Sequence, residues 1–263
     1  MNMEDRDANR PTISVCVITY NEEHNIVDCL ESVKWADEII VVDSDSIDRT
    51  VELAKNYTKN VIINKWHGYV AQKNFALEHA TCDWVLCLDA DERITPELKE
   101  EVLNAMAKNN AADAYYIKRH TYYLGKWINH CGWYPDYKIR LIKRGKGRWD
   151  GIDPHDRIVS TGRADYLNAE LHHFTYRNFS HQLKIIDRFS DVATDEYMKA
   201  GKPYCIFKML FHPPLKFLGV YIWKMGFMDG FQGFIIAVAS AFYVFSKYVK
   251  LWEKTNLQRQ ITK

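Results

Sequence analysis

The chain has 263 residues, of which 47% are apolar and 14% aromatic, enough for one large domain or one domain with an appendage. Its formal net charge is only +1, but residues 199–263 carry +8 and the rest of the chain carries −7. Six scattered cysteines without a Cys-x-x-Cys pair give no zinc or redox motif, and residues 1–10 lack the apolar stretch of a signal peptide. We therefore expect a reduced, cytosolic protein whose basic, aromatic tail has a partner.

Strand and helix signals alternate along residues 13–125, as they do in parallel α/β sheets. Strands are predicted at 13–18, 38–42, 61–63 and 85–88, and helices at 22–33, 48–57 and 69–79. Another helix is predicted to begin at Thr95-Pro96-Glu97, because Thr can cap, Pro suits the first helical position and Glu favours the positive helix end. Since the strands are nearly continuous apolar runs, they indicate a mostly parallel sheet covered on both faces.

Polar residues follow several of these strands, at the sheet edge where ligands of parallel sheets bind. They are Tyr20, Asp43, Asp45, Asp89 and Asp91. Because side chains alternate along a strand, Asp89 and Asp91 are expected to share one face. Two such carboxylates can hold a divalent cation, which can neutralise a diphosphate. A solvated pair of acids is the commoner interpretation of Asp-x-Asp alone, and the other strand-end residues reverse that preference.

The segment 113–170 has a different pattern, with short strand signals at 115–117 and 139–142 and turns near Gly145 and Gly162. It predicts an added antiparallel or mixed section, followed by a helix over 178–198. No Gly-x-Gly-x-x-Gly follows the first strand, and no Gly-x-x-x-x-Gly-Lys-Ser phosphate loop occurs. The sequence therefore does not predict a dinucleotide-binding fold or a phosphate loop.

Four segments together resemble family 2 glycosyltransferases, which have the GT-A fold, in that family's order and spacing. They are residues 14–23, 41–50, 72–77 and 88–92. A looser likeness to lipopolysaccharide inner-core heptose β-glucosyltransferases rests on residues 149–156, 173–176, 226–230 and 233–234. The resemblance implies a Rossmann-like α/β domain over 11–175, with an acceptor-side section at about 113–170 and a helical region over 176–263.

The resemblance also implies a nucleotide-sugar site. Tyr20 would stack on the nucleobase, and Asp43 would accept a hydrogen bond from a uracil N–H. Lys73 would meet the diphosphate or the base, and Asp91, with Asp89 nearby, would hold Mn²⁺ or Mg²⁺. Taken singly, each residue has an ordinary structural explanation, and their joint occurrence in order favours the site. The implied donor-binding residues are Thr19, Tyr20, Glu22, Asp43, Asp45, Lys73, Asp89, Ala90 and Asp91.

An inverting transfer needs a base for the acceptor hydroxyl, and the predicted base is Asp156. The subgroup often has His-Glu where this chain has His155-Asp156, and Asp153 is a rival three residues earlier. An ion pair of Asp156 with Arg157 or Arg163 is the structural alternative. His173 would complete the metal shell or touch the diphosphate, and the alternative is a structural histidine.

The tail interleaves aromatic and aliphatic residues with lysines over 204–252. Its uncharged run, 230–246, has 17 residues, which is short against the roughly 20 of a membrane span. We therefore predict interfacial helices that place lysines toward anionic lipid. A helical subdomain packed on the body, or on a second subunit in a homo-oligomer, is the alternative. The uncharged run fits lipid better than nucleic acid.

These features predict a metal-dependent, inverting hexosyltransferase on the inner face of the cell membrane. It would move a hexose, with glucose favoured, from a UDP-sugar to a lipid-linked glycan such as the lipopolysaccharide inner core. A polyprenyl-linked or other surface glycan is the alternative acceptor. A nucleotidyltransferase would usually show a Gly-rich basic loop where this chain has residues 19–22. A non-catalytic nucleotide-sugar or membrane-binding module is the remaining class.

Overall fold

The computed structural model describes residues 10–151 and 156–256, which form two compact units. The first unit comprises the chain up to Arg119 together with Asp136–His173. The second comprises His120–Pro135 and the chain from Phe174 onward. Asp153 and His155 lie outside the described residues.

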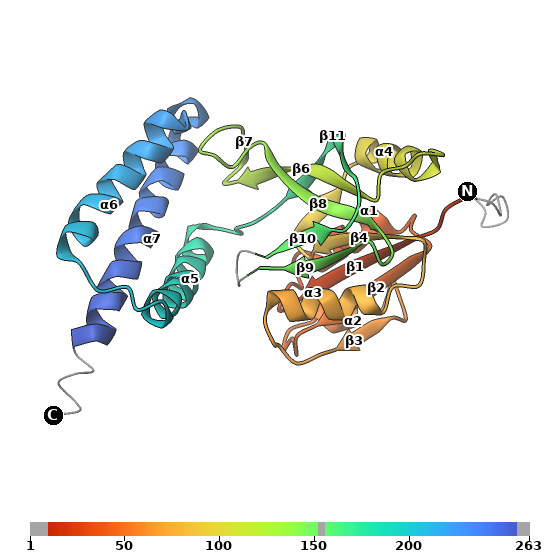
Figure 1. Ribbon diagram of the computed structural model, residues 1–263, viewed down its shortest axis with the longest axis horizontal. Coiled ribbons are helices and arrows are strands. Elements are labelled where there is room, and N and C mark those ends of the chain that lie inside the picture. The colour runs from red at the N-terminus through yellow and green to blue at the C-terminus, as the bar shows by residue number, and fades with distance from the viewer. Residues whose placement is uncertain (1–9, 152–155, 257–263) are drawn as a thin grey trace. The chain divides into compact units, whose positions relative to one another are not determined.

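One mixed sheet forms the centre of the first unit (Figure 1), with its strands in the order β3-β2-β1-β4-β8-β6-β11-β5. Parallel pairing joins β1 (Ile13–Thr19) to β2 (Glu38–Asp43) and β4 (Trp84–Asp89), and β2 to β3 (Val61–Ile63). Antiparallel pairing joins β8 (Asp136–Lys143) to β4 and β6 (Ala114–Tyr123), and β11 (Ala164–His173) to β5 (Glu92–Ile94). The expected antiparallel or mixed section is therefore present, and it extends the parallel sheet.

The predicted helices of the first unit are confirmed, with some ends shifted. They are α1 (Ile26–Val33), α2 (Thr50–Ala54), α3 (Tyr69–Glu78) and α4 (Pro96–Ala107). Thr95 caps α4 as expected, because its hydroxyl accepts a hydrogen bond from the Leu98 amide at 3.1 Å. Helix α1 begins later than predicted, at Ile26, and the turn before it is tied to the neighbouring loop, where the amides of Glu22 and Glu23 donate to Thr50 and Asp48.

Both faces of the sheet are covered by apolar layers, which explains the continuous apolar strands. Val15 and Val17 of β1 join a core cluster with residues of α1 and α4, and Cys16 between them joins a second cluster. The second cluster packs α3 and the hairpin of β9 (Gly147–Asp150) and β10 (Arg157–Ser160). Each buried aliphatic side chain stabilises the fold by about 1.5–3 kcal/mol.

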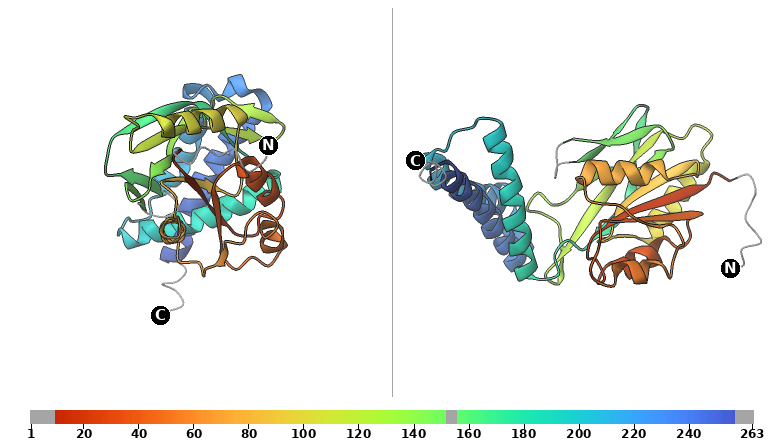
Figure 2. Two further views of the ribbon diagram at one scale, coloured as in Figure 1. Left: turned by 90° about the vertical axis from the view of Figure 1, so that its right-hand side faces the viewer. Right: turned by 90° about the horizontal axis from the view of Figure 1, so that it is seen from below.

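Three helices make up most of the second unit: α5 (Phe179–Lys199), α6 (Ile206–Leu218) and α7 (Gly230–Asn256). A π-helical turn (Gly219–Trp223) and a 3-10 turn (Gly226–Asp229) link α6 to α7. Figures 1 and 2 show α6 alongside α7. The helix predicted over 178–198 is confirmed as α5, whose cap residue Asn178 accepts from the His181 amide at 2.8 Å. Strand β7 (Lys126–Ile128) pairs antiparallel with the end of β6.

The start of α7 is fastened to the loop after β7. The Asp229 carboxylate is buried and accepts hydrogen bonds from the amides of Asn129 (3.2 Å) and His130 (2.8 Å). Gly233 contacts the preceding 3-10 turn so closely that a Cβ atom there would lie 1.8 Å from the Gly226 carbonyl oxygen. Only glycine fits this approach of helix and turn.

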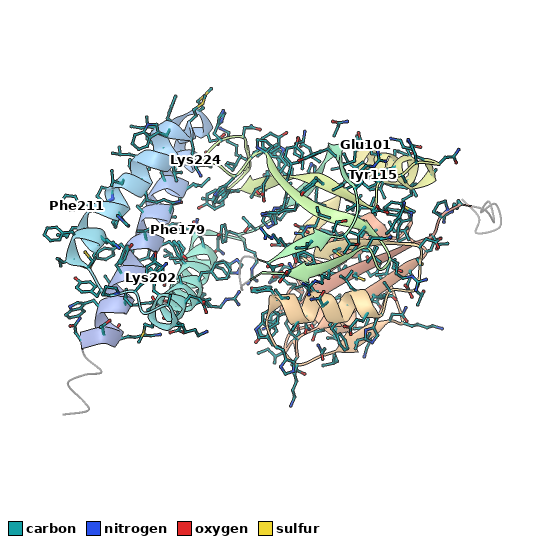
Figure 3. The ribbon with its side chains drawn as sticks, in the orientation of Figure 1. Glu101, Tyr115, Phe179, Lys202, Phe211 and Lys224 are labelled. Atoms are coloured by element: carbon teal, nitrogen blue, oxygen red, sulfur yellow. The ribbon has the colours of Figure 1, made fainter. Side chains whose placement is uncertain are left out.

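A large apolar surface lies on α6 and on the start of α7. No residue of α6 is buried, and its exposed side chains include Phe207, Leu210 and Phe211. Figure 3 shows Phe211 projecting from α6 on the side away from α7. By length and composition, the helical stretch Gly226–Asn256 is long and apolar enough to cross a membrane, and 28% of its most apolar window is buried.

Candidate active site

The loops after β1 and β2 are joined by hydrogen bonds that shape one side of the site. The Asn21 amide donates to Ser46 Oγ at 2.8 Å, and the Ile47 amide donates to Asn21 Oδ1 at 2.9 Å. Ser46 in turn donates to Asp43 through its amide (2.8 Å) and its hydroxyl (2.5 Å). Burial raises the pKa of the Asp43 carboxyl, although the Ser46 hydrogen bonds oppose the rise. Asp43 is therefore a buried, fixed acceptor at a strand end.

An exposed aromatic ring follows the end of β1, one residue after Thr19, which is in register with Asp43 on β2. Tyr20 is 51% exposed, and Asp45 is also exposed, in a left-handed backbone conformation with φ 60°. The Thr19 hydroxyl is buried and has no hydrogen-bond partner within the described part of the chain. Glu22 lies at the start of the α1 turn, where its Oε2 accepts from Asn25 Nδ2 at 2.7 Å. An open ring next to fixed polar groups is an arrangement that can stack on and select a nucleobase.

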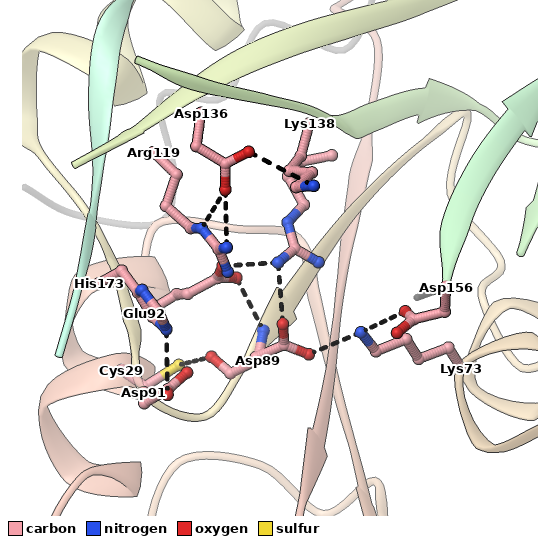
Figure 4. A network of polar contacts seen from close by, with 11 residues as sticks. Cys29, Lys73, Asp89, Asp91, Glu92, Arg119, Asp136, Lys138, Asp156 and His173 are labelled. Atoms are coloured by element: carbon pink, nitrogen blue, oxygen red, sulfur yellow. Dashed lines mark hydrogen bonds and ion pairs between the residues drawn. The ribbon is translucent and has the colours of Figure 1, made fainter. Parts of the chain in front are cut away.

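Asp89 and Asp91 point in different directions (Figure 4). The expectation that strand alternation places both on one face is wrong, because β4 ends at Asp89 and a turn at Ala90 and Asp91 precedes β5. Asp89 lies between two cations, with Oδ1 3.0 Å from Lys73 Nζ and Oδ2 2.8 Å from Arg140 Nη2. Asp91 Oδ2 instead lies 3.3 Å from His173 Nε2. Ala90 is buried in the core.

These partners keep both carboxylates ionised. Burial alone would raise the pKa of Asp89, but the charges and hydrogen bonds of Lys73 and Arg140 outweigh it and hold the pKa far below its ordinary value. For Asp91 too, burial is outweighed, here chiefly by the charge and hydrogen bond of His173, so the pKa is lowered. The site therefore presents two anions at neutral pH.

Asp89 belongs to a larger buried ion network. Arg140 Nη2 lies 2.5 Å from Glu92 Oε1, and Glu92, which is fully buried, accepts from the Asp89 amide at 2.9 Å. Arg119 joins Glu92 (3.5 Å) to Asp136 (2.7 Å). Buried charges persist when they are paired in this way. Sequence reasoning missed Arg119, Arg140 and Glu92, although an arginine inside the apolar run 139–142 was an available signal.

Lys73 connects the donor-side carboxylate to the predicted base. Its Nζ lies 2.8 Å from Asp156 Oδ2 and 4.2 Å from the centroid of the Trp149 ring. Burial alone would lower the pKa of Lys73, but the carboxylates of Asp89 and Asp156 outweigh it and raise the pKa above its ordinary value. Within the described residues Asp156 pairs with Lys73, and neither Arg157 nor Arg163 forms an ion pair with it.

Comparison with known proteins identifies the family. Residues 14–162 match the sequence model of the family described as Glycosyl transferase family 2. The chain belongs to this family. The lipopolysaccharide core biosynthesis glycosyltransferase LpsC of Rhizobium meliloti is 31% identical over 253 residues, which cover 94% of each chain. An uncharacterized glycosyltransferase of Rickettsia typhi is 31% identical over 268 residues, covering 95% of this chain and 89% of that one.

Solved structures show the same fold. A mannosyltransferase from Pyrobaculum calidifontis, in complex with GDP-Man and Mn²⁺, has a TM-score of 0.55 at 16% identity and covers 94% of this chain and 89% of its own. The protein is therefore a family 2 glycosyltransferase with a GT-A-like α/β fold and a relative of lipopolysaccharide core biosynthesis enzymes. The predicted family, fold class and enzyme class are confirmed.

In this glycosyltransferase a side-chain clamp holds β9, the first strand of the hairpin that carries Asp156. Asn74 Nδ2 donates to the Trp149 carbonyl oxygen, and the Trp149 amide donates to Asn74 Oδ1, both at 2.9 Å. The Asn74 amide thereby pairs with β9 as a neighbouring strand would. Because Lys73 is the adjacent residue of α3, the clamp places the hairpin next to the ammonium group that contacts Asp156.

The carboxylates differ in how well they fit a metal ion. Both oxygens of Asp89 already face cations, whereas Asp91 and His173 face each other, and among the described residues the Asp91 carboxylate forms no other ion pair. Within residues 10–151 and 156–256 no group of three or more His, Cys, Asp or Glu side chains forms a metal site. A pair of protein ligands nevertheless fits Mg²⁺, which keeps several waters and binds substrate phosphates.

Proposed function

We propose that this glycosyltransferase is an inverting, metal-dependent enzyme that moves a hexose, with glucose favoured, from a UDP-sugar to a lipid-linked glycan of the lipopolysaccharide inner core. The observation that carries the proposal is the position of Lys73, which bridges Asp89 of the Asp-x-Asp motif and Asp156. Asp156, which would serve the acceptor, and Asp89, at the donor edge of the sheet, are thereby held within one ion network. The likeness to LpsC supports the choice of acceptor.

On the donor side, Tyr20 would stack on uracil and Asp43 would accept a hydrogen bond from the ring N–H. The buried, unpartnered Thr19 hydroxyl supports a ligand at this strand end, because leaving such a group unbonded costs about 1–3 kcal/mol. A base without that N–H would leave the buried Asp43 carboxylate without its partner, so uridine donors would be preferred.

Asp91 and His173 would hold Mn²⁺ or Mg²⁺, and the metal would supply the positive charge that stabilises the diphosphate as a leaving group. Asp89 would fix Lys73 and Arg140 at the edge of the site, since its two oxygens are engaged by these cations. Lys73 would present its buried positive charge to the diphosphate side of the site.

Asp156 would act as the base. Its Oδ2 is engaged by Lys73, so Oδ1 would take the proton of the acceptor hydroxyl as that oxygen bonds to the anomeric carbon. The bond between the anomeric carbon and the diphosphate oxygen breaks at the same time, and the diphosphate leaves with its electron pair. Attack from the face opposite the leaving group inverts the anomeric configuration.

The exposed apolar surface of α6 and α7 would lie in the headgroup region on the inner face of the cell membrane. Lys208, Lys216 and Lys224 add positive charge near this surface. A spanning α7 is disfavoured because its uncharged run 230–246 has 17 residues, short against the roughly 20 of a span, and beyond the run Lys250 pairs with Asp187 (2.7 Å) and Asp191 (2.9 Å) of α5. Self-association through the same surface is the competing explanation.

A donor panel tests the reaction. The full-length protein is incubated with Mn²⁺ or Mg²⁺ and UDP-glucose, UDP-galactose, UDP-N-acetylglucosamine or GDP-mannose, and released nucleoside diphosphate is measured. Slow release from one UDP-hexose, stimulated by lipopolysaccharide core and abolished by a chelator, is expected. Release of pyrophosphate, a preference for GDP-mannose, or turnover that survives complete metal removal would contradict the proposal.

Asp156→Asn is the matched variant, because it keeps shape and removes only the charge and basicity. It is expected to abolish transfer while nucleotide-sugar binding, measured by calorimetry, persists. Unchanged turnover in this variant would remove Asp156 from the mechanism and direct attention to Asp153.

A further inference from the structure

Three tyrosines form an exposed cluster on the antiparallel side of the sheet, which we call the tyrosine platform: Tyr116, Tyr137 and Tyr166. Tyr116 and Tyr166 stack, with ring centroids 4.8 Å apart and 18° between the planes. Tyr137 meets Tyr166 edge-on at 5.2 Å and 86°. Tyr166 is 57% exposed and Tyr137 is 41% exposed. Exposed rings that are gathered into one patch, in contrast to rings scattered singly, are a feature of interaction sites.

The platform lies on the face of the sheet that also carries the Asp156 hairpin. On β11, Leu167 and Leu171 point into the core cluster shared with α4, so Tyr166 points to the opposite face. Tyr116 packs against the second core cluster, which contains Ile158 of β10. Asp156 directly precedes β10, and β10 packs on β8, the strand that carries Tyr137.

A charged pair lies on the same face as the rings. Lys118 and Glu170, two and four residues after Tyr116 and Tyr166 on β6 and β11, lie 3.5 Å apart. Asp136 and Lys138, the neighbours of Tyr137 on β8, lie on the opposite face by the same alternation. Flat rings that offer an apolar face, next to charged groups that bind hydroxyls, are complementary to a pyranose ring, which has apolar C–H faces and a rim of hydroxyls.

We propose that the tyrosine platform binds the saccharide portion of the acceptor and positions its hydroxyl toward Asp156. This inference rests on the proposed function, since the acceptor must lie beside the base. The occupant is a glycan because the Lys118–Glu170 pair beside the rings carries no net positive charge, which attraction to an anionic lipid surface would need. The three strands also place Arg119, Arg140 and His173 in the site, so a bound glycan would sit on the same rigid framework.

The test uses Tyr166→Ala and Tyr137→Ala in the full-length protein, with Tyr166→Phe retaining the ring. Tyr57→Ala is the matched control, because Tyr57 is a half-buried tyrosine after α2, at the other end of the sheet. Loss of one stacking ring is expected to raise the KM for core oligosaccharide, released from lipid A by mild acid, by about tenfold or more. The values of Tyr166→Phe and Tyr57→Ala are expected to stay within about twofold of wild type.

Acceptor-independent hydrolysis of the UDP-hexose separates this inference from the proposed function. Wild-type hydrolysis with an unchanged acceptor KM in both alanine variants would overturn the platform and leave the enzyme assignment standing. Absence of hydrolysis and transfer in the wild type would overturn the proposed function itself. Loss of binding to sugar-free anionic vesicles, with oligosaccharide binding intact, would show that the rings contact lipid and would also overturn the inference.

Discussion

Lys73 and Asp156 form an ion pair at 2.8 Å across 83 residues of sequence, and only 8% and 10% of their side chains are exposed. The same ammonium group contacts Asp89 at 3.0 Å. One cation therefore balances two carboxylates from different parts of the chain. Its removal would leave Asp156 without this partner and Asp89 with Arg140 alone, in a site with little solvent.

We expect Lys73→Met to lower the free energy of unfolding by about 3 kcal/mol, because removing one partner leaves buried charges uncompensated. Donor hydrolysis should fall as well, since the diphosphate side loses its positive charge. Urea unfolding and UDP release measure the two effects. Lys55→Met, at an exposed helix end, is the control and should change stability by less than about 0.5 kcal/mol. A fully stable and active Lys73→Met would contradict the bridging role.

The acid dependence of stability should reveal Asp89. Its pKa in the folded state is depressed, so its stabilising contribution is complete above the unfolded value of about 3.9 and is lost as pH falls through the folded pKa. Asp89→Asn should therefore flatten the loss of stability between about pH 5 and pH 3, measured by urea unfolding.

The contribution of Asp43 to the pH dependence of stability should have the opposite sign. Burial raises its folded pKa, so its contribution is present at low pH and is lost as pH rises through that pKa. Asp43→Asn should therefore make stability fall more steeply on acidification, in the same urea series. A change of the same sign in Asp43→Asn and Asp89→Asn would contradict these assignments.

Metal dependence should separate the two acids of the Asp-x-Asp motif. Asp91→Asn is expected to raise the Mn²⁺ concentration for half-maximal activity by at least about tenfold, because Asp91 faces His173 and would be a direct ligand. Asp89→Asn should shift that concentration less, since its oxygens face Lys73 and Arg140. Titration of activity with Mn²⁺ after chelation gives both values. Equal shifts of the half-maximal Mn²⁺ concentration in the two variants would indicate that Asp89 is also a metal ligand.

The Asn74 clamp should matter for transfer more than for donor binding. Asn74→Ala removes two hydrogen bonds to the Trp149 main chain, worth about 1 kcal/mol each. We expect stability to fall by about 2 kcal/mol and kcat for transfer to fall, with the affinity for UDP-sugar retained. Asn74→Asp is the partial replacement, because it keeps the acceptor for the Trp149 amide and loses the donor. If donor affinity fell in parallel with kcat, the clamp would not act through the hairpin.

Membrane association should depend on the exposed rings of α6. Phe207→Asp and Phe211→Asp each remove a ring whose burial in lipid is worth about 1.5–3 kcal/mol, so flotation with anionic vesicles should weaken by tenfold or more. Met198→Asp, an exposed apolar position on α5, is the control and should float as wild type does. Unchanged flotation, together with a change of mass in sedimentation, would favour an oligomer surface.

Local chemistry made much of the fold predictable. The Thr95 cap, the Asn178 start of α5 and the apolar β-strands depend on a few neighbouring residues, and each appears where the pattern places it. The start of α1 was missed because the residues before Ile26 form a turn that is tied by hydrogen bonds to the loop after β2. That loop lies more than twenty residues further along the chain, so no local sequence pattern predicts these hydrogen bonds.

The residue types at the strand ends of the site were predictable from the sequence. Which of these side chains pair with one another was not. Which cation faces Asp89 depends on the order β4-β8-β6, which brings Arg140 beside it. The divergence of Asp89 and Asp91 follows from a turn one residue earlier than periodicity indicates. Long-range strand order and the exact end of a strand are both set by tertiary packing, so the sequence pattern could not supply them.

The contact between Gly226 and Gly233 has a consequence for how α7 is oriented. Because a single methyl group at position 233 would collide with the Gly226 carbonyl, the helix cannot roll about its own axis or slide by one residue without losing the contact. The rotation of α7 about its own axis is thereby fixed, and so is the set of its side chains that face outward. The contact between Gly226 and Gly233 thus sets which face of this long apolar helix is exposed.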